Sequence, residues 1–284
     1  MRVYVFTRLR FLCLLIVAIL FFWYFSHPVL LVNTARQVTM ILTGRIIPIY
    51  SVERPDKRLS VTFDATWGAD QTKELLKILR DNGVKATFFL CGLWVEKYPE
   101  MVKAIAEEGH EIGNHSHTHP HMNNLSAEEI AHEILRTHQL IRELTGQSPT
   151  VFRPPYGEYN NKLIETARSC GYSTIIWDVD SLDWKNLSAA EMVNRIVRRV
   201  QPGSIILCHN AGKHTPQTIA TLIPLLKKQG YEFTPVSQLL LEGDTFTDHT
   251  GRQKQKKVAP TIRDFPGQIN LTSGKKADGK WGGN

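Results

Sequence analysis

The sequence predicts an α/β fold in which about seven parallel strands form a distorted, closed or nearly closed (β/α) barrel. Seven short apolar runs alternate with six amphipathic segments along residues 58–237, and glycines follow most of the amphipathic segments, as they do at helix C-termini. Strands that are separated by helices of three or more turns pair in parallel. A doubly wound open sheet is the alternative arrangement of the same elements.

The predicted elements follow one another with little interruption. The strands are expected at RLSVTFDA (58–65), KATFFLCG (85–92), HEIGNHS (110–116), TVFRPPYG (150–157), STIIWDVD (173–180), SIILCHN (204–210) and YEFTPVS (231–237). The helices are expected at 70–81, 96–108, 126–145, 160–170, 188–200 and 215–229.

Four regions are expected along the chain. Residues 1–33 are predicted to be a signal anchor or transmembrane helix, and residues 34–57, which contain Pro48 and Pro55, to be a linker. Residues 58–242 hold the predicted barrel. Residues 243–284 contain the polar, basic stretches GRQKQKK and SGKKADGKWGG, whose composition predicts a disordered tail.

The N-terminal prediction depends on one apolar run. Arg2, Arg8 and Arg10 precede Phe11–Val32, a run that approaches the roughly 20 residues needed to span a bilayer. Basic residues before such a run favour a cytoplasmic N-terminus, which places the barrel outside the membrane. A cleaved signal peptide, and hence a secreted protein, is the alternative.

The charge of the chain bears on its partners. The formal net charge is +7 among 284 residues, of which 42% are hydrophobic. The basic excess lies toward the two ends and is not a stripe with interleaved aromatic residues, so the pattern argues against nucleic acid as a partner. A basic surface of this kind favours an anionic polymer or a membrane face.

Polar residues occur where the predicted strands end. In a barrel of parallel strands, functional residues gather at the C-terminal ends of the strands and in the loops that follow. The residues at those ends are Asp64, His115, Arg153, Asp178, Asp180 and His209. Separate strands therefore bring carboxylates, imidazoles and a guanidinium to one rim.

The stretch GNHSHTHPHMNN carries four histidines, His115, His117, His119 and His121. Imidazole nitrogens suit zinc and other late first-row ions. Taken alone, a histidine-rich turn is as well explained by solvated surface, so the companion residues on the other strands decide in favour of a metal site.

Residues 59–241 resemble the polysaccharide deacetylases of the NodB-homology type, carbohydrate esterase family 4, and most of all their membrane-anchored, sporulation-associated subgroup. Five motifs occur in order: TFDA (62–65), HSHTH (115–119), RPPYG (153–157), DSLDW (180–184) and ILCH (206–209). The resemblance implies a distorted barrel and the hydrolysis of N-acetyl groups on a sugar polymer.

The resemblance also implies roles for individual residues. His115 and His119 match metal ligands for a divalent ion, with zinc the first choice, and Asp64 matches a catalytic base that Arg153 orients. His209 matches a general acid held by Asp183. For substrate binding, Tyr156 offers a backbone N–H to the oxyanion, and Trp184 and Leu207 wall the acetyl pocket.

One position departs from the family pattern. The family usually reads Thr-Phe-Asp-Asp, and its second aspartate completes the metal site, but this chain has Ala65 there. Three interpretations follow: two histidines and water hold the ion more weakly, a carboxylate such as Asp70 or Asp180 replaces the missing ligand, or metal and activity are lost. Of the two carboxylates, Asp70 is more simply explained as a helix N-cap.

The sequence therefore leaves hypotheses of different classes. The first is an extracytoplasmic, metal-dependent deacetylase of peptidoglycan amino sugars with a link to sporulation. The second is a membrane-tethered glycan-binding protein on a degenerate deacetylase fold. An esterase on acetylated xylan or chitin shares the chemistry but gives no reason for a tether.

Overall fold

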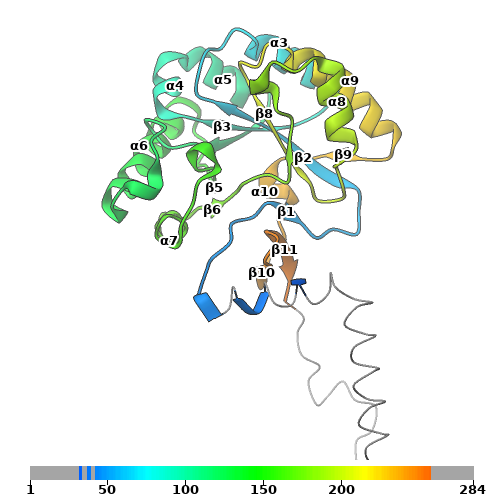
Figure 1. The fold of residues 1–284 in the computed structure, drawn as a ribbon. Coiled ribbons are helices and arrows are strands. Elements are labelled where there is room, and N and C mark those ends of the chain that lie inside the picture. Colours follow the sequence, from blue (N-terminus) through cyan, green and yellow to red (C-terminus); the bar gives the residue numbers. More distant parts are fainter. Residues whose placement is uncertain (1–31, 34–36, 40–41, 257–284) are drawn as a thin grey trace, which may run out of the picture.

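The structure, a computed structural model, describes residues 32–33, 37–39 and 42–256 (Figure 1). Within this part of the chain no helix is both long and apolar enough to cross a bilayer. Apart from Val32 and Asn33, the predicted anchor lies outside the described residues, as does the predicted tail from residue 257 onward.

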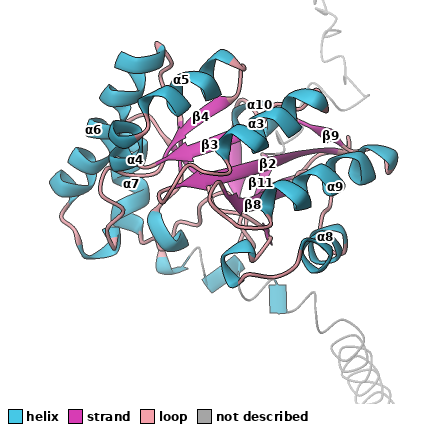
Figure 2. Ribbon diagram, turned by 90° about the horizontal axis from the view of Figure 1, so that it is seen from above, coloured by secondary structure: helices cyan, strands magenta, loops and turns pink. Residues whose placement is uncertain are grey.

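A curled parallel sheet forms the centre of the molecule. Its strands run in the order β6-β5-β4-β3-β2-β8-β7, and β9 pairs with the beginning of β2. Helices surround it, as Figure 2 shows from above. The prediction of a distorted (β/α) barrel is thus confirmed. The strands are β2 (Arg58–Ala65), β3 (Thr87–Leu90), β4 (Glu111–Asn114), β5 (Val151–Phe152), β6 (Ser173–Thr174), β7 (Val179–Asp180), β8 (Ile205–His209) and β9 (Glu232–Phe233).

The helices cover the outer side of this sheet. They are α3 (Thr72–Asp81), α4 (Gly92–Lys97), α5 (Pro99–Glu107), α6 (Ala127–Thr145), α7 (Asn161–Ser169), α8 (Ala189–Val197), α9 (Thr215–Lys228) and α10 (Val236–Leu239). Single 3-10 turns lie at Met122–Asn124, Pro155–Gly157 and Asp183–Lys185. Ser126 and Ser188 start α6 and α8 with capping boxes to Glu129 and Glu191, which satisfy N–H groups that lack a partner within the helix.

The alternation of side chains along β2 sets up the site. Leu59, Val61 and Phe63 belong to the main apolar cluster, which the helices also join. Successive residues of a strand point to opposite faces, so Thr62 and Asp64 face the inside of the curled sheet. There the Thr62 hydroxyl donates to the carbonyl of Ile206, 2.7 Å away.

Several predicted elements need correction. The helix predicted at 96–108 is two helices, because Pro99 cannot donate the N–H that a continuous helix needs and instead starts α5. The strand predicted at 173–180 is split into β6 and β7, which form the two edges of the sheet. The strand predicted at 231–237 ends early, and Pro235 there caps α10.

The predicted linker and tail also contain structure. Strand β1 (Ser51–Val52) lies in the predicted linker, and β10 (Thr245–Thr247) and β11 (Arg252–Gln255) lie in the range predicted to be disordered. The three pair as a second sheet in the order β1-β11-β10. The polar composition of this segment concealed its strands, because the partner of β11 lies about 200 residues earlier in the chain.

Candidate active site

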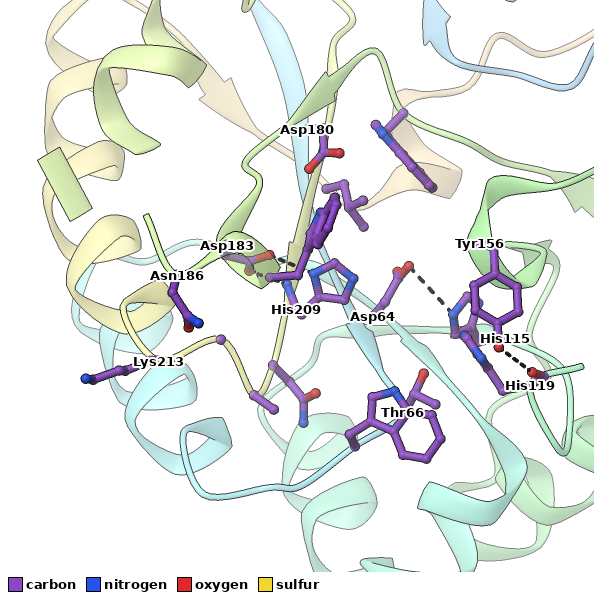
Figure 3. Close-up of a pocket in the computed structure, with 17 residues that line it drawn as sticks. Asp64, Thr66, His115, His119, Tyr156, Asp180, Asp183, Asn186, His209 and Lys213 are labelled. Carbon is purple, nitrogen blue, oxygen red and sulfur yellow. Dashed lines mark hydrogen bonds and ion pairs between the residues drawn. The ribbon is translucent and has the colours of Figure 1, made fainter. Parts of the chain in front are cut away.

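A cavity of about 700 Å³ opens at the C-terminal ends of the strands (Figure 3). Eight of the nine predicted site residues line it, and the ninth, Arg153, is fully buried next to Asp64. The lining residues are Asp64, Thr66, Trp67, His115, His119, Tyr156, Trp177, Asp180, Asp183, Trp184, Asn186, Leu207, His209, Asn210, Ala211, Gly212 and Lys213. Separate strands thus converge on one hollow, but Asp178, also predicted at this rim, does not line it, and its carboxylate accepts the Ser204 hydroxyl and the Ile205 N–H.

Asp64 forms a buried ion pair with Arg153. Arg153 Nη1 lies 2.6 Å from Asp64 Oδ1, and the same guanidinium donates to the Thr62 hydroxyl and to the carbonyl of Ile176. Burial opposes ionisation of Asp64, but the charge of Arg153 outweighs it and lowers the pKa of the carboxyl. Asp64 is thus held as a carboxylate in a fixed orientation.

His209 is oriented by Asp183. Its Nδ1–H donates to Asp183 Oδ1 at 2.7 Å, while Oδ2 of the same carboxylate accepts the backbone N–H of His209 and the hydroxyl of Thr215. Burial favours the neutral imidazole, yet the hydrogen bond and charge of Asp183 outweigh it, so the pKa of His209 is raised. With Nδ1 occupied, Nε2 is the nitrogen left to exchange a proton with a ligand in the cavity.

His115 and His119 lie on the other side of Asp64 (Figure 3). His115 Nδ1 donates to the carbonyl of Arg153 at 2.7 Å, so its Nε2 carries the lone pair and lies 3.7 Å from Asp64 Oδ2. The ring centroids of the two histidines are 5.0 Å apart, and His119 Nδ1 is buried with no hydrogen-bond partner. Burial lowers the pKa of His119 to about 4, so the imidazole is neutral at neutral pH.

Glu133 of α6 fixes the loop that carries these histidines. Its Oε2 accepts the backbone N–H groups of His117 and Thr118, and its Oε1 accepts the Thr118 hydroxyl, each at 2.8 Å. Ser116 and His119 have φ values of 65° and 59°, which residues other than glycine seldom adopt. The bonds to Glu133 therefore stabilise a strained loop.

The side chains near His115 and His119 offer fewer ligands than a divalent ion usually has. Two neutral imidazoles suit zinc, but a catalytic zinc site normally has three protein ligands. Among the described residues no three His, Cys, Asp or Glu side chains are grouped closely enough to hold an ion. Ala65 is fully buried in the main apolar cluster and has no donor atom. The described residues therefore do not fit a three-ligand centre.

Neither carboxylate that could replace the missing ligand completes this centre. Asp180 lines the cavity, but its Oδ1 accepts the backbone N–H of Leu182. Asp70 is exposed and does not line the cavity. It is not the N-cap of α3 either, because that position is Gln71.

The three residues predicted to bind substrate lie at the cavity with different exposure. Leu207 is buried, whereas the Tyr156 and Trp184 side chains are exposed. Tyr156 has a φ of 59° within its Pro-Pro turn, and its hydroxyl donates to the carbonyl of His119. The roles assigned to these side chains from the resemblance stay predictions.

Sequence reasoning missed several lining residues. Trp67 lies two residues after the end of β2, and Lys213 four residues after the end of β8, so their places in loops that follow strand ends were readable signals. Trp177 and Asn186 gave no such signal, because they lie in irregular segments between β6 and α8.

Known proteins resemble this chain over most of the barrel. The sequence profile described as "Polysaccharide deacetylase" matches residues 51–175. A peptidoglycan-N-acetylglucosamine deacetylase of Bacillus cereus is 37% identical over 196 residues, which cover 67% of this chain and 92% of that protein. The chain therefore belongs to the polysaccharide deacetylase family.

Two further relatives differ in their described activity: one is a deacetylase and the other a pseudoenzyme. The peptidoglycan-N-acetylglucosamine deacetylase PgdA of Listeria monocytogenes is 35% identical over 74% of this chain, but the match spans only 45% of PgdA. The crystal structure of BA3943 of Bacillus anthracis, described as a family 4 pseudoenzyme, is 35% identical with a TM-score of 0.66 and covers 68% of each chain. A mutant of BA3943 is described as having restored enzymatic activity.

Proposed function

We propose that this protein removes N-acetyl groups from amino sugars of a cell-wall polysaccharide, with N-acetylglucosamine of peptidoglycan as its substrate. The observation that carries the proposal is the pair of oriented groups, Asp64 with Arg153 and His209 with Asp183, that face one cavity. The family membership and the deacetylases among its relatives support the substrate class.

The proposed chemistry assigns one proton transfer to each oriented group. Asp64 takes a proton from a water molecule while the water oxygen bonds to the acetyl carbon. Protonated His209 then donates a proton to the nitrogen of the sugar as the C–N bond breaks, which releases acetate and the free amine. The raised pKa of His209 supports this role, because it enlarges the protonated fraction near neutral pH.

Other residues would position the acetyl group. Leu207 and Trp184 supply apolar contact for the acetyl methyl group, and the backbone N–H of Tyr156 is the proposed donor to the carbonyl oxygen as it gains charge. The fixed Pro155–Gly157 turn favours this role for Tyr156, because a preorganised donor needs no rearrangement during the reaction.

A divalent ion, zinc first, would use His115 and His119 as protein ligands. Such an ion polarises a carbonyl and lowers the pKa of a bound water. Because the chain supplies two imidazoles where three ligands are usual, we propose that binding is weak.

A second function is favoured by the same incomplete donor set. A protein with this cavity that lacks a functional metal centre would bind N-acetylated glycan without hydrolysing it. The similarity to BA3943, described as a pseudoenzyme, supports this alternative.

We further propose that residues 1–33 tether the protein to the cell membrane as a single-pass anchor, with the barrel on the extracytoplasmic side. The basic run before Phe11–Val32 supports this orientation. A link to sporulation also stays a proposal, based on the resemblance of the five motifs.

The test is acetate release from purified peptidoglycan by the full-length chain, measured as isolated, after chelation, and after zinc is added back. The proposed deacetylase releases acetate, and Asp64→Asn and His209→Gln each reduce the rate at least 100-fold, in line with the roughly 10²–10⁴-fold that general acid–base groups contribute. Glycan binding without acetate release under all three conditions would instead establish the second function.

A further inference from the structure

Three aromatic side chains are exposed at the mouth of the cavity. Trp67, Tyr156 and Trp184 have exposed fractions of 71%, 54% and 58%, and all three line it. Large aromatic residues usually bury most of their surface, so a tryptophan that remains 71% exposed contributes little to the apolar core. Three exposed aromatic side chains grouped at one cavity favour a role in binding.

The loop that carries Trp67 is nevertheless rigidly held. The carbonyl of Gly68 accepts hydrogen bonds from Trp94 Nε1 at 2.6 Å and from Asn210 Nδ2 at 3.1 Å. Both donor side chains are 1% exposed, and Gly68 adopts a φ of 60°, which glycine tolerates without strain. The backbone beside Trp67 is thus fixed from two directions while the indole faces solvent. An aromatic anchor fixed in this way loses little conformational entropy when it binds a ligand.

Trp67 and Trp184 lie near different members of the site. The Trp67 ring centroid lies 6.0 Å from that of His119, whereas Trp184 directly follows Asp183, the partner of His209. Figure 3 shows His119 on one side of Asp64 and the Asp183–His209 pair on the other. Trp67, Trp184 and Asp64 all line this cavity, so a ligand that fills it can contact both indoles beside Asp64.

We propose that Trp67 is a stacking platform for a sugar ring that neighbours the deacetylated one, so that the protein binds an internal stretch of a glycan strand. The inference rests on the proposed function and names its substrate as a polymer of N-acetylated sugars. A β-linked pyranose presents a face of C–H groups, and an exposed indole offers the flat apolar surface that such a face contacts. The cavity of about 700 Å³ is far larger than one acetyl group requires, which agrees with a site for several rings.

The test measures binding, and a chelator is present in every titration to suppress turnover. Isothermal titration of the full-length chain with N-acetylglucosamine oligomers of two to six sugars compares the unmodified protein with Trp67→Ala. We expect the unmodified protein to bind longer oligomers more tightly. Trp67→Ala should weaken binding of the hexamer about 5- to 30-fold and leave the dimer within about twofold, because truncating an interface anchor costs a factor of this size. Trp67→Phe keeps a ring and should retain most of the affinity.

The matched control is Leu93→Ala, which removes another exposed apolar side chain that does not line the cavity and should leave all affinities unchanged. Trp67→Gln repeats the truncation with a polar side chain, so the test does not depend on one variant folding. Unchanged hexamer affinity in the Trp67 truncations, equal losses for dimer and hexamer, or no length dependence in the unmodified protein would each overturn the inference.

The design separates this inference from the proposed function. If no variant releases acetate but Trp67→Ala still selectively loses the longer oligomers, the platform stands and the deacetylase activity fails. If acetate is released normally while Trp67→Ala binds every oligomer as the unmodified chain does, the activity stands and the platform fails.

Discussion

Arg153 Nη1 lies 2.6 Å from Asp64 Oδ1, and both side chains are almost completely removed from solvent. The guanidinium lies over the ring of Phe89, 4.1 Å from the ring centroid, so water has little access to the pair. An ion pair in such a place is a weak source of net stability, but removing one partner leaves the other charge buried and uncompensated. The pair therefore links the stability of the barrel to the ionisation of the proposed base.

We predict that Arg153→Met destabilises the protein by about 3–5 kcal/mol at pH 7 because Asp64 then has no counter-charge. The lowered pKa of Asp64 in the native protein means that its contribution is present above the unfolded value, about 3.9, and is lost as pH falls through the native value. The difference between the two proteins should accordingly shrink in acid. Denaturant unfolding at several pH values measures it.

A surface pair supplies the control for this prediction. Arg136 pairs with Glu96 at 3.2 Å, and both side chains are about 40% exposed, so Arg136→Met should change the free energy of unfolding by at most about 1 kcal/mol. If the two substitutions changed the free energy of unfolding equally, loss of the buried pair would cost no more than loss of a surface pair, and the prediction would be wrong.

The pH dependence of activity should follow His209. Its pKa is raised above the ordinary value of about 6.5, so the stability gained from its charged pair with Asp183 is fully present below that value and is lost as pH rises through the native pKa. A general acid must be protonated, so the rate should also fall as pH rises through the same value. Asp183→Asn should lower the pKa of His209 and move this alkaline limb to lower pH. NMR titration of the imidazole and a pH–rate profile measure the two shifts.

Asp180→Asn is the matched comparison for this prediction, because Asp180 raises the pKa of His209 less than Asp183 does. We expect a downward shift that is smaller than that of Asp183→Asn. A larger shift in Asp180→Asn than in Asp183→Asn would show that Asp180, and not Asp183, controls the pKa of His209.

The parts of the fold that the sequence predicted share a physical cause. Strands β2, β3 and β8 are central and buried, so apolar residues recur along them, and the polar residue near the end of such a strand is easily seen. Asp64 and His209 were found in this way. The edges of the sheet were harder, because β6 and β7 are only two residues long and the segment between them leaves the sheet.

Other features depend on contacts that no local pattern contains. Strand β11 is polar and is ordered by its pairing with β1, far away in the chain. The exposure of Trp67 was equally hidden, since the place of a tryptophan in the sequence does not fix how much of its side chain faces solvent. The break at Pro99, in contrast, was available from the sequence, because proline favours the first position of a helix over its interior.

Glu133 gives a prediction about the histidine loop. Removing its carboxylate in Glu133→Ala deletes three hydrogen bonds to His117 and Thr118, so we expect hydrogen exchange at these two amides to accelerate at least tenfold. Acetate release and zinc affinity should fall together, because the loop carries His115 and His119. Glu143 lies on the same helix, and its carboxylate accepts a hydrogen bond from Gln139. Glu143→Ala should therefore change neither the loop nor the activity. Unchanged exchange in Glu133→Ala would show that the strained loop does not need this residue.

The final prediction concerns the position of Ala65. The unmodified chain should bind zinc weakly, because two imidazoles are one protein ligand fewer than a catalytic zinc site usually has. Chelation should therefore remove the ion without unfolding the barrel. Ala65→Asp adds a carboxylate at a buried position, so in the absence of metal it should lower the free energy of unfolding. Zinc should then restore stability and bind at least tenfold more tightly than to the unmodified chain, because an ion that binds only the folded protein stabilises it.

Calorimetric zinc titration and thermal unfolding with and without zinc measure both effects, and Ala65→Asn, similar in size but uncharged, is the control. If zinc affinity is the same in all three proteins, the carboxylate does not reach the ion, and the weakness of the centre must have a cause other than the residue at position 65.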